Sequence, residues 1–244
     1  MTTEEKQTAV RFEQVNFSVG GTHILKNISG SIRKGKITTL VGPSGAGKTS
    51  LFRLCNGMQS PDTGEILIEE KNISDYDPVV LRRMVGIALQ SATMIRGTVA
   101  ENLALPLELQ GKELPKDDAA ELLNIVGLEE NLMNRKAKDL SGGQRQKLSI
   151  ARTLVNRPQI LLLDEITSSL DRVSQQDIEE LIIRINKKYG TTIIWITHSL
   201  QQALHIGDFT WVMMAGEVVE TGESSLLENP QNDRVRRFVK GEVE

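Results

Sequence analysis

The sequence predicts an α/β fold in which a mostly parallel sheet carries helices on both faces. Largely apolar runs at residues 37–41 and 191–197, and an uninterrupted one at 160–164 that ends in an acid, are typical of parallel strands that are buried on both faces. Residues 175–189 place apolar side chains at helical spacing between two of these runs. Alternating apolar and polar residues near the start of the chain predict a small antiparallel sheet before the first buried strand.

The predicted antiparallel sheet begins with residues 9–19, whose alternation is that of a half-buried strand. Gly20-Gly21 predicts a hairpin turn, and residues 23–32 continue the antiparallel pattern. A further short strand is expected at 65–69. Residues 9–90 are therefore expected to hold this antiparallel subdomain and the first part of the parallel core.

Residues 91–155 are expected to form an inserted helical subdomain, because Leu, Glu, Asn and Lys become frequent there and helical spacing appears. The core resumes over 156–223, and 224–244 is expected to be a charged helical tail, so that 1–244 is one domain. The helix at 175–189 is predicted to end at Gly190. Its apolar face is predicted to comprise Ile178, Leu181, Ile182, Ile185 and Tyr189.

Composition excludes several classes of protein. A net charge of −3 and an aromatic content of 4% argue against a nucleic-acid partner. The single cysteine, Cys55, cannot form an internal disulfide, so a buried packing role in a reducing compartment is expected. Met1–Lys6 has no apolar secretory core, and no apolar run approaches the ~20 residues that span a bilayer. We expect a cytoplasmic protein whose membrane partner, if it works at a membrane, is another chain.

A glycine-rich stretch after the first buried strand matches the pattern G-x-x-x-x-G-K-[ST] and leads into a predicted helix. Its glycines allow backbone N–H groups to wrap around a phosphate, and the helix N-terminus adds partial positive charge. Lys48 would place its charge on the terminal phosphates, and Thr49 would offer a hydroxyl to Mg²⁺. A chance glycine-rich turn would not explain the strand and helix on either side. The nucleotide-binding residues predicted here are Gly42, Pro43, Ser44, Gly45, Ala46, Gly47, Lys48, Thr49 and Ser50.

Polar residues follow the other predicted parallel strands: Gln90, Asp164-Glu165 and His198. Ligands of such sheets lie at the carboxyl ends of the strands, so these residues are expected to converge on one site. Asp164 is predicted to hold Mg²⁺ through water, and Glu165 to orient and activate the attacking water. His198 would sense the γ-phosphate. Gln90 would contact metal or water and couple the nucleotide to the helical subdomain.

Each of these roles has a plainer alternative. The acids could be solvated caps of a strand, and Gln90 could be a surface loop residue. A lone histidine is more often structural, which is the interpretation kept for His23 and His205. The phosphate loop upstream favours the functional interpretation of the acids and of His198.

A second small-residue helix start lies at Leu140-Ser141-Gly142-Gly143-Gln144. A helix N-terminus of this kind can bind an anion. Two phosphate-recognising helix starts in one chain suggest that the second serves another nucleotide. The simplest geometry is a head-to-tail dimer of two copies with two ATP molecules between them. Ser141, Gly142, Gly143 and Gln144 are therefore predicted nucleotide contacts.

In these motifs and in their order, the sequence resembles the ATP-binding subunits of ABC transporters. The Walker A loop at 42–49, Gln90 of the Q-loop, LSGGQ at 140–144, the Walker B strand with Glu165, and the switch histidine His198 carry the resemblance. Ser168 to Asp171 resembles the D-loop, which implies that Asp171 communicates across the dimer. The fold implied is a P-loop NTPase core, similar to RecA, with an antiparallel β-subdomain and an inserted helical subdomain.

The resemblance implies a motor that binds ATP and Mg²⁺, hydrolyses ATP and moves the coupling helices of a separate transmembrane permease. It would lie on the cytoplasmic face of the membrane through that partner. The sequence departs from the family pattern at three positions. Val19 stands where an aromatic residue usually stacks on adenine, and Phe17 could take its place if the turn differs. Ile166 replaces a proline and Ser169 an alanine, without removing a catalytic group.

The sequence gives less information about the transported substrate. The run Asp-Glu-Ile-Thr-Ser at 164–168 and the region 93–99 resemble a small bacterial subgroup linked to export of iron or other metals. The tail resembles that of small-solute importers instead. Two rival classes were weighed. A soluble ABC ATPase of translation or DNA repair usually has two such domains or a coiled-coil insertion, and a non-hydrolysing module would lack the catalytic groups present here.

Overall fold

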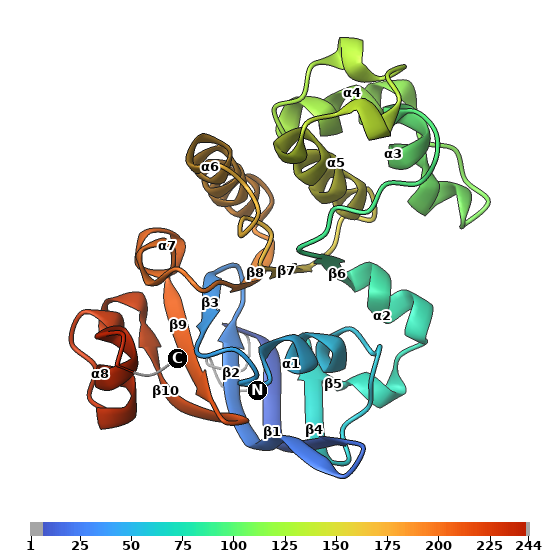
Figure 1. Cartoon of the computed structure of the whole chain (residues 1–244). Helices are drawn as coiled ribbons and strands as arrows, with labels where there is room; N and C mark the ends of the chain where they lie inside the picture. Colours follow the sequence, from blue (N-terminus) through green and yellow to red (C-terminus); the bar gives the residue numbers. More distant parts are fainter. Residues whose placement is uncertain (1–6, 243–244) are drawn as a thin grey trace.

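The structure is a computed structural model that describes residues 7–242; residues 1–6 and 243–244 of the predicted domain 1–244 lie outside the described part. Its centre is a six-stranded sheet in the order β10-β9-β3-β8-β7-β6 (Figure 1). Strands β6, β7, β8, β3 and β9 are parallel, and β10 is antiparallel at the edge. The strands are β3 (Ile37–Val41), β6 (Val85–Ala88), β7 (Ile160–Asp164), β8 (Thr192–Ile196), β9 (Phe209–Met214) and β10 (Glu217–Glu223).

A second, antiparallel sheet has the order β2-β1-β4-β5. It is formed by β1 (Thr8–Val19), β2 (Thr22–Arg33), β4 (Thr63–Ile68) and β5 (Lys71–Asn72). Val19 pairs with Thr22, so the predicted hairpin at Gly20-Gly21 is confirmed. One hydrophobic core joins this sheet to the parallel one, and in it Phe12 and Trp211 lie with ring centroids 5.6 Å apart. The antiparallel subdomain is thus anchored to the sheet that carries the site.

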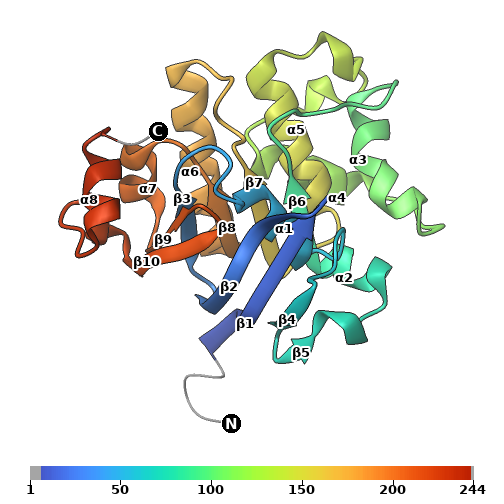
Figure 2. The same ribbon diagram turned by 60° about the horizontal axis from the view of Figure 1, so that its bottom comes forward.

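Helix α1 (Lys48–Cys55) follows β3, and α2 (Pro78–Met84) precedes β6. Cys55 is buried within α1's packing, and burial raises the pKa of its thiol to about 12, so it is an unreactive packing residue as expected. Residues 91–155 carry α3 (Val99–Glu108), α4 (Lys116–Ile125) and α5 (Gly142–Leu154). These three helices form a group beside the parallel sheet in Figures 1 and 2.

The remaining helices are α6 (Arg172–Tyr189), α7 (Leu200–Ile206) and α8 (Asp233–Val239). α6 ends at Gly190, whose φ of 64° is the left-handed conformation expected of a terminating glycine. Its predicted apolar face is buried at Ile178, Leu181, Ile182 and Ile185. Tyr189 was wrongly assigned to that face: it is 46% exposed, because it is the last residue of the helix and borders a cavity. The tail is only partly helical, with a 3₁₀ turn at Ser224–Leu227 before α8.

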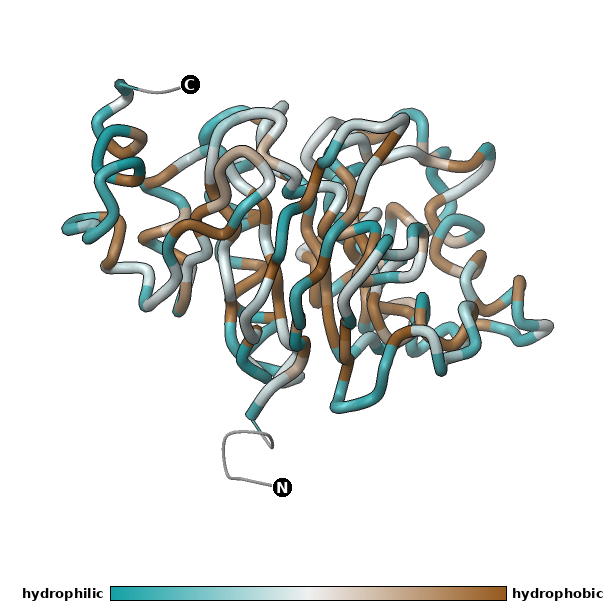
Figure 3. The backbone as a smooth tube through the Cα atoms, turned by 90° about the horizontal axis from the view of Figure 1, so that it is seen from below, coloured by the Kyte–Doolittle hydropathy of each residue, from teal (hydrophilic) through white to brown (hydrophobic). Residues whose placement is uncertain are grey.

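Hydrophobic segments gather in the middle of the molecule, and hydrophilic ones lie in the outer loops and helices (Figure 3). Within residues 7–242, no helix combines the length and the apolar character that crossing a membrane requires.

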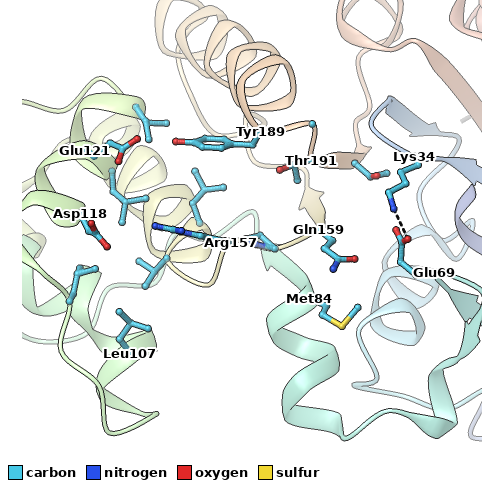
Figure 4. A pocket seen from close by; sticks show the side chains of 18 residues that line it. Lys34, Glu69, Met84, Leu107, Asp118, Glu121, Arg157, Gln159, Tyr189 and Thr191 are labelled. Atoms are coloured by element: carbon cyan, nitrogen blue, oxygen red, sulfur yellow. Dashed lines mark hydrogen bonds and ion pairs between the residues drawn. The ribbon is translucent and has the colours of Figure 1, made fainter. Parts of the chain in front are cut away.

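A cavity of about 800 Å³ lies between the helical subdomain and the core, at the amino ends of β7 and β8 (Figure 4). Tyr189 and Arg157 line it on one side, and the Lys34–Glu69 ion pair lies on the other. Its lining carries charges of both signs. The chain returns from α5 to β7 along this cavity, through residues 155–159, whereas it enters the helical subdomain after β6, where the polar strand ends lie.

Candidate nucleotide site

The loop between β3 and α1 has a backbone that only glycine permits at two points. Gly42 has a φ of 143°, and a Cβ atom there would lie 1.9 Å from the carbonyl oxygen of Met213. Gly47, with a φ of 95°, would place a Cβ 2.7 Å from Leu25. The amide of Ala46 donates to the carbonyl of Pro43 at 3.3 Å. The loop therefore folds tightly against β9 and β2 and opens toward the N-terminus of α1.

Lys48 is buried at the start of α1, and its Nζ donates to the loop carbonyls of Gly42 at 2.7 Å and Pro43 at 2.8 Å. Burial lowers the pKa of Lys48, while the negative charges of Glu165 and Asp164 act in the opposite direction. In this position the ammonium group closes the loop on itself. A phosphate entering the loop would offer the ammonium group a charged acceptor in place of two neutral carbonyls.

Thr49 and Asp164 bring two oxygen atoms together from α1 and β7. Thr49 Oγ1 donates to Asp164 Oδ1 at 3.4 Å. Burial raises the pKa of Asp164, and the neighbouring charge of Glu165 adds to this, while the Thr49 hydrogen bond opposes it. The described residues contain no cluster of three or more metal-ligating His, Cys, Asp or Glu side chains. One hydroxyl and one carboxylate fit Mg²⁺, which takes few protein ligands when phosphate and water oxygens complete its shell.

Glu165 and His198 face each other across the ends of β7 and β8, with Glu165 Oε1 2.7 Å from His198 Nε2. Glu165 has a φ of 51°, in the left-handed region that non-glycine residues seldom occupy. Its amide donates to the carbonyl of Ile196 at 3.1 Å, which ties this bend to β8. Strained backbone of this kind persists where the surroundings hold it, commonly at functional positions.

Gln90 follows β6 and lies on the same edge of the sheet. Its Nε2 donates to Ser168 Oγ at 2.9 Å, and Ser168 Oγ donates to the carbonyl of Glu165 at 3.0 Å. The structure thus connects Gln90 to Glu165 through Ser168. Its contact with metal or water stays a prediction.

A cavity of about 310 Å³ gathers the phosphate loop, Glu165 and His198. Residues 44–50 form one wall, and Ile24 of β2 forms another. Sequence reasoning missed Ile24, because nothing in its local pattern shows that β2 lies against the loop. Gln90 and Val19 are outside this lining.

The second glycine-rich motif begins α5 with a capping box. Ser141 Oγ accepts from the amide of Gln144 at 3.2 Å, and Gln144 Oε1 accepts from the amide of Ser141 at 3.0 Å. Ser141, Gly143 and Gln144 line a separate cavity of about 510 Å³. The linings of this cavity and of the phosphate-loop cavity share no residue. The two predicted nucleotide-binding motifs therefore line separate cavities of one chain.

Asp171 caps α6. Its carboxylate accepts from the amide of Ser174 at 3.0 Å and from the Ser174 hydroxyl at 2.8 Å. These hydrogen bonds lower the pKa of Asp171. A Cβ atom on Gly143 would lie 3.0 Å from the same Ser174 hydroxyl, so the D-loop cap lies close to the start of α5.

The two candidates for stacking on adenine differ in exposure. Val19 is 52% exposed at the tip of the first hairpin, whereas Phe17 is 7% exposed and packs in the core. The suggestion that Phe17 replaces the missing aromatic residue is wrong, because its ring already forms part of the core. Val19 stays the predicted contact.

The chain belongs to the ABC transporter family, whose family profile matches residues 25–168. It is an ATP-binding cassette of that family and an ATPase. The chain is 42% identical over 238 residues to the putative ABC transporter ATP-binding protein YjkB of Bacillus subtilis, covering 96% of this chain and 94% of YjkB. It is 40% identical over 239 residues to the methionine import ATP-binding protein MetN of Mesorhizobium japonicum, covering 94% of this chain and 65% of MetN.

Two solved structures have the same fold. One is cbiO1 from Clostridium perfringens, part of the ABC transporter complex cbiONQ, with a TM-score of 0.83, 29% identity, and coverage of 97% of this chain and 99% of that one. The other is a dimeric ATP-binding cassette in a post-hydrolysis state bound to ADP and Pi, with a TM-score of 0.77 and 30% identity over 88% of this chain and 98% of that one. The expected ABC ATPase fold is confirmed.

Proposed function

We propose that two copies of this cassette bind two ATP molecules head to tail and power solute movement through a separate transmembrane permease. The observation that carries the dimer is the separation of the two cavities, one lined by the phosphate loop and the other by Ser141 to Gln144. A two-fold pairing places the α5 start of one copy opposite the phosphate loop of the other. The dimeric cassette among the similar structures supports this arrangement.

Within each site, the hydrogen bonds described above support the following roles. Residues 42–50 cradle the phosphates, and Lys48 exchanges its loop carbonyls for the terminal phosphates. Thr49 and Asp164 would hold Mg²⁺, which supplies charge neutralisation at the phosphates when bound. Glu165 orients and activates the attacking water, and His198, at 2.7 Å, holds the carboxylate and contacts the γ-phosphate. Gln90, which is hydrogen-bonded to Ser168, couples the presence of the nucleotide to the position of the helical subdomain.

Exposed apolar residues on either side of β6, on α2 and next to Gln90, favour a membrane protein partner. Val79 and Val80 on α2 are 51% and 45% exposed, and Leu89, next to Gln90, is 47% exposed. Exposed large apolar side chains are common in protein interfaces. We assign this surface to the permease's coupling helices, which places the cassette on the cytoplasmic face of the membrane.

The substrate proposed is a small solute. The resemblance of 164–168 and 93–99 to the metal-export subgroup favours a metal ion such as iron. Relatives named for methionine import favour an amino acid and uptake. Transport of labelled iron and of labelled methionine into vesicles that contain the cassette and the membrane protein encoded beside it distinguishes these two solutes.

The catalytic assignment is tested by Glu165→Gln. This variant keeps the shape of the side chain and removes the carboxylate, so we expect ATP binding and ATP-dependent dimers with ATP turnover at least about a hundredfold lower. Light scattering with ATP and steady-state phosphate release measure the two properties. Turnover at the wild-type rate would remove Glu165 from its role, and a monomer in ATP would contradict the two-copy site.

The rival proposal is an ABC ATPase without a membrane partner. It predicts that Val80→Glu leaves the activity of the protein in the cell unchanged. Under the transporter proposal, the same substitution leaves the ATPase activity of the purified chain intact, because α2 is away from the phosphate cavity, and abolishes assembly with the co-expressed permease.

A further inference from the structure

A buried group of polar side chains lies beside the Glu165–His198 pair. Gln202 is 6% exposed and Thr167 5%, and Glu179 is half-buried. Nε2 of Gln202 donates to Glu179 Oε1 at 2.7 Å and to Thr167 Oγ1 at 3.1 Å. Buried polar groups are costly unless they are hydrogen-bonded, so a satisfied group of this kind holds its members in one arrangement.

This group joins the two segments that carry the catalytic pair. Thr167 lies on the turn that follows β7, two residues after Glu165, and Gln202 lies in the first turn of α7, four residues after His198. Glu179 belongs to α6, which lies next to α7 in both Figure 1 and Figure 2. One amide side chain therefore connects three elements.

The turn after β7 needs such support. Glu165 has a φ of 51°, and a strained residue of this kind persists only where its surroundings hold it. Gln175 of α6 donates from Nε2 to the carbonyls of Thr167 at 3.1 Å and Leu170 at 3.0 Å. Those bonds fix the turn to α6, and the bonds of Gln202 fix the same turn to α7.

We propose that Gln202 is a positioning residue for ATP hydrolysis: by clamping Thr167 and Glu179, it sets the Glu165 carboxylate at its 2.7 Å distance from His198. Gln202 does not touch the nucleotide cavity, which is lined by the phosphate loop, Ile24, Glu165 and His198. It acts through the two segments that present the catalytic side chains. This role rests on the proposed function of Glu165 and His198.

The amide is the group that this place requires. The Glu179 carboxylate accepts a hydrogen bond, so its neighbour must donate. A carboxylate at position 202 would bring two negative charges together in a partly buried space, and a methionine would fill the volume without donating. An altered angle between the two segments displaces Glu165 from the attacking water, and a displacement of about 1 Å can lower the rate ~100-fold.

The experiment measures steady-state ATP hydrolysis by the full chain at a temperature well below the melting temperature of every variant. We expect Gln202→Met to lower kcat about tenfold or more while KM for ATP changes less than about twofold. Gln202→Glu should be slower still. Adding Glu179→Gln to Gln202→Glu reverses donor and acceptor and should restore most of kcat.

The matched control is Gln201→Met, the same substitution at the exposed neighbouring position, which should leave kcat and KM unchanged. If the melting temperature of Gln202→Met falls while its kcat stays that of the wild type, Gln202 is structural only and the inference is wrong. Failure of the double variant to recover activity also overturns it. Should Gln202→Met not fold, Thr167→Val removes the hydrogen bond between Gln202 and Thr167 from the other side, and the same fall in kcat is expected. Undiminished turnover by Glu165→Gln would refute the proposed function instead.

Discussion

At the scale of single residues, the candidate site depends on side chains that protein hydrogen bonds hold in position. Lys48 is occupied by two loop carbonyls, Thr49 by Asp164, and Glu165 by His198. The partners of Lys48 and Asp164 are neutral groups, so a phosphate or a metal ion would offer each of them a stronger interaction. Each of these polar side chains nevertheless has a hydrogen-bond partner, as buried polar groups require.

We predict that Lys48→Ala loses most ATP binding. A hydrogen bond from a charged group contributes about 1.5–3 kcal/mol, so affinity should fall roughly ten- to hundredfold. Titration with a fluorescent ATP analogue measures the change. Lys36→Ala removes the same charge from the surface and should bind normally. Tight binding by the Lys48 variant would contradict the assignment of the phosphate loop.

We predict that Val19→Tyr strengthens nucleotide binding, because the exposed tip of the hairpin gains a ring that can stack on a base. Base stacking contributes about 1–3 kcal/mol and tolerates different bases, so ATP and GTP should both bind more tightly. Ser18→Tyr adds the same ring one residue earlier and serves as the control. Unchanged affinity for both nucleotides would show that Val19 is not at the adenine position.

At the scale of elements, two helices of the inserted subdomain begin with the same device. Ser141 and Gln144 form a capping box at α5, and Thr98 and Glu101 form one at α3. The two boxes contribute alike to stability, since each satisfies two amide groups at a helix start. They differ in place, because only the box of α5 belongs to the predicted nucleotide contacts.

We predict that Ser141→Ala and Thr98→Ala each lower the free energy of unfolding by about 1 kcal/mol. In a Glu165→Gln background, ATP-dependent dimers should weaken with Ser141→Ala and stay unchanged with Thr98→Ala. Chemical denaturation and light scattering measure the two effects. Equal loss of dimers in both variants would show that α5 acts through stability alone and does not contact ATP.

At the scale of the whole molecule, the polar residues of the candidate site lie at the carboxyl ends of the parallel strands, and the cavity of about 800 Å³ lies at their amino ends. The chain enters the helical subdomain after β6, at the carboxyl ends, and returns to the core through residues 155–159, beside the cavity. Gln90 lies on the first of these two connections, and we therefore predict that it couples the bound nucleotide to the position of the helical subdomain.

We predict that two inactive variants regain activity when mixed. In a heterodimer of Lys48→Ala with Ser141→Arg, one site combines both substitutions and the other combines two intact halves. Phosphate release by the mixture should therefore exceed that of either variant alone. Mixing either variant with itself is the control. A mixture no more active than its components would contradict a site shared between two copies.

The class of fold and the candidate site residues follow from the sequence. Its phosphate loop, LSGGQ motif and Walker B acids are contiguous, and contiguous motifs need only local backbone geometry to be recognised. Buried parallel strands also show as largely apolar runs, so the sequence predicts that Gln90, Glu165 and His198 lie together at the carboxyl ends of the strands, and the parallel pairing of β3, β6, β7 and β8 agrees with this.

Only the tertiary structure decided the contacts between segments that are distant in sequence. In the folded chain Ile24 lies against the phosphate loop, Phe17 is buried in the core, and Tyr189 is exposed at a cavity. Gln202 is hydrogen-bonded to Thr167 and Glu179. No local pattern encodes these outcomes, because they depend on the register of paired strands and the docking of helices on the sheet. The residue types fix what each side chain can do, and the packing of the strands and helices fixes which partner it meets.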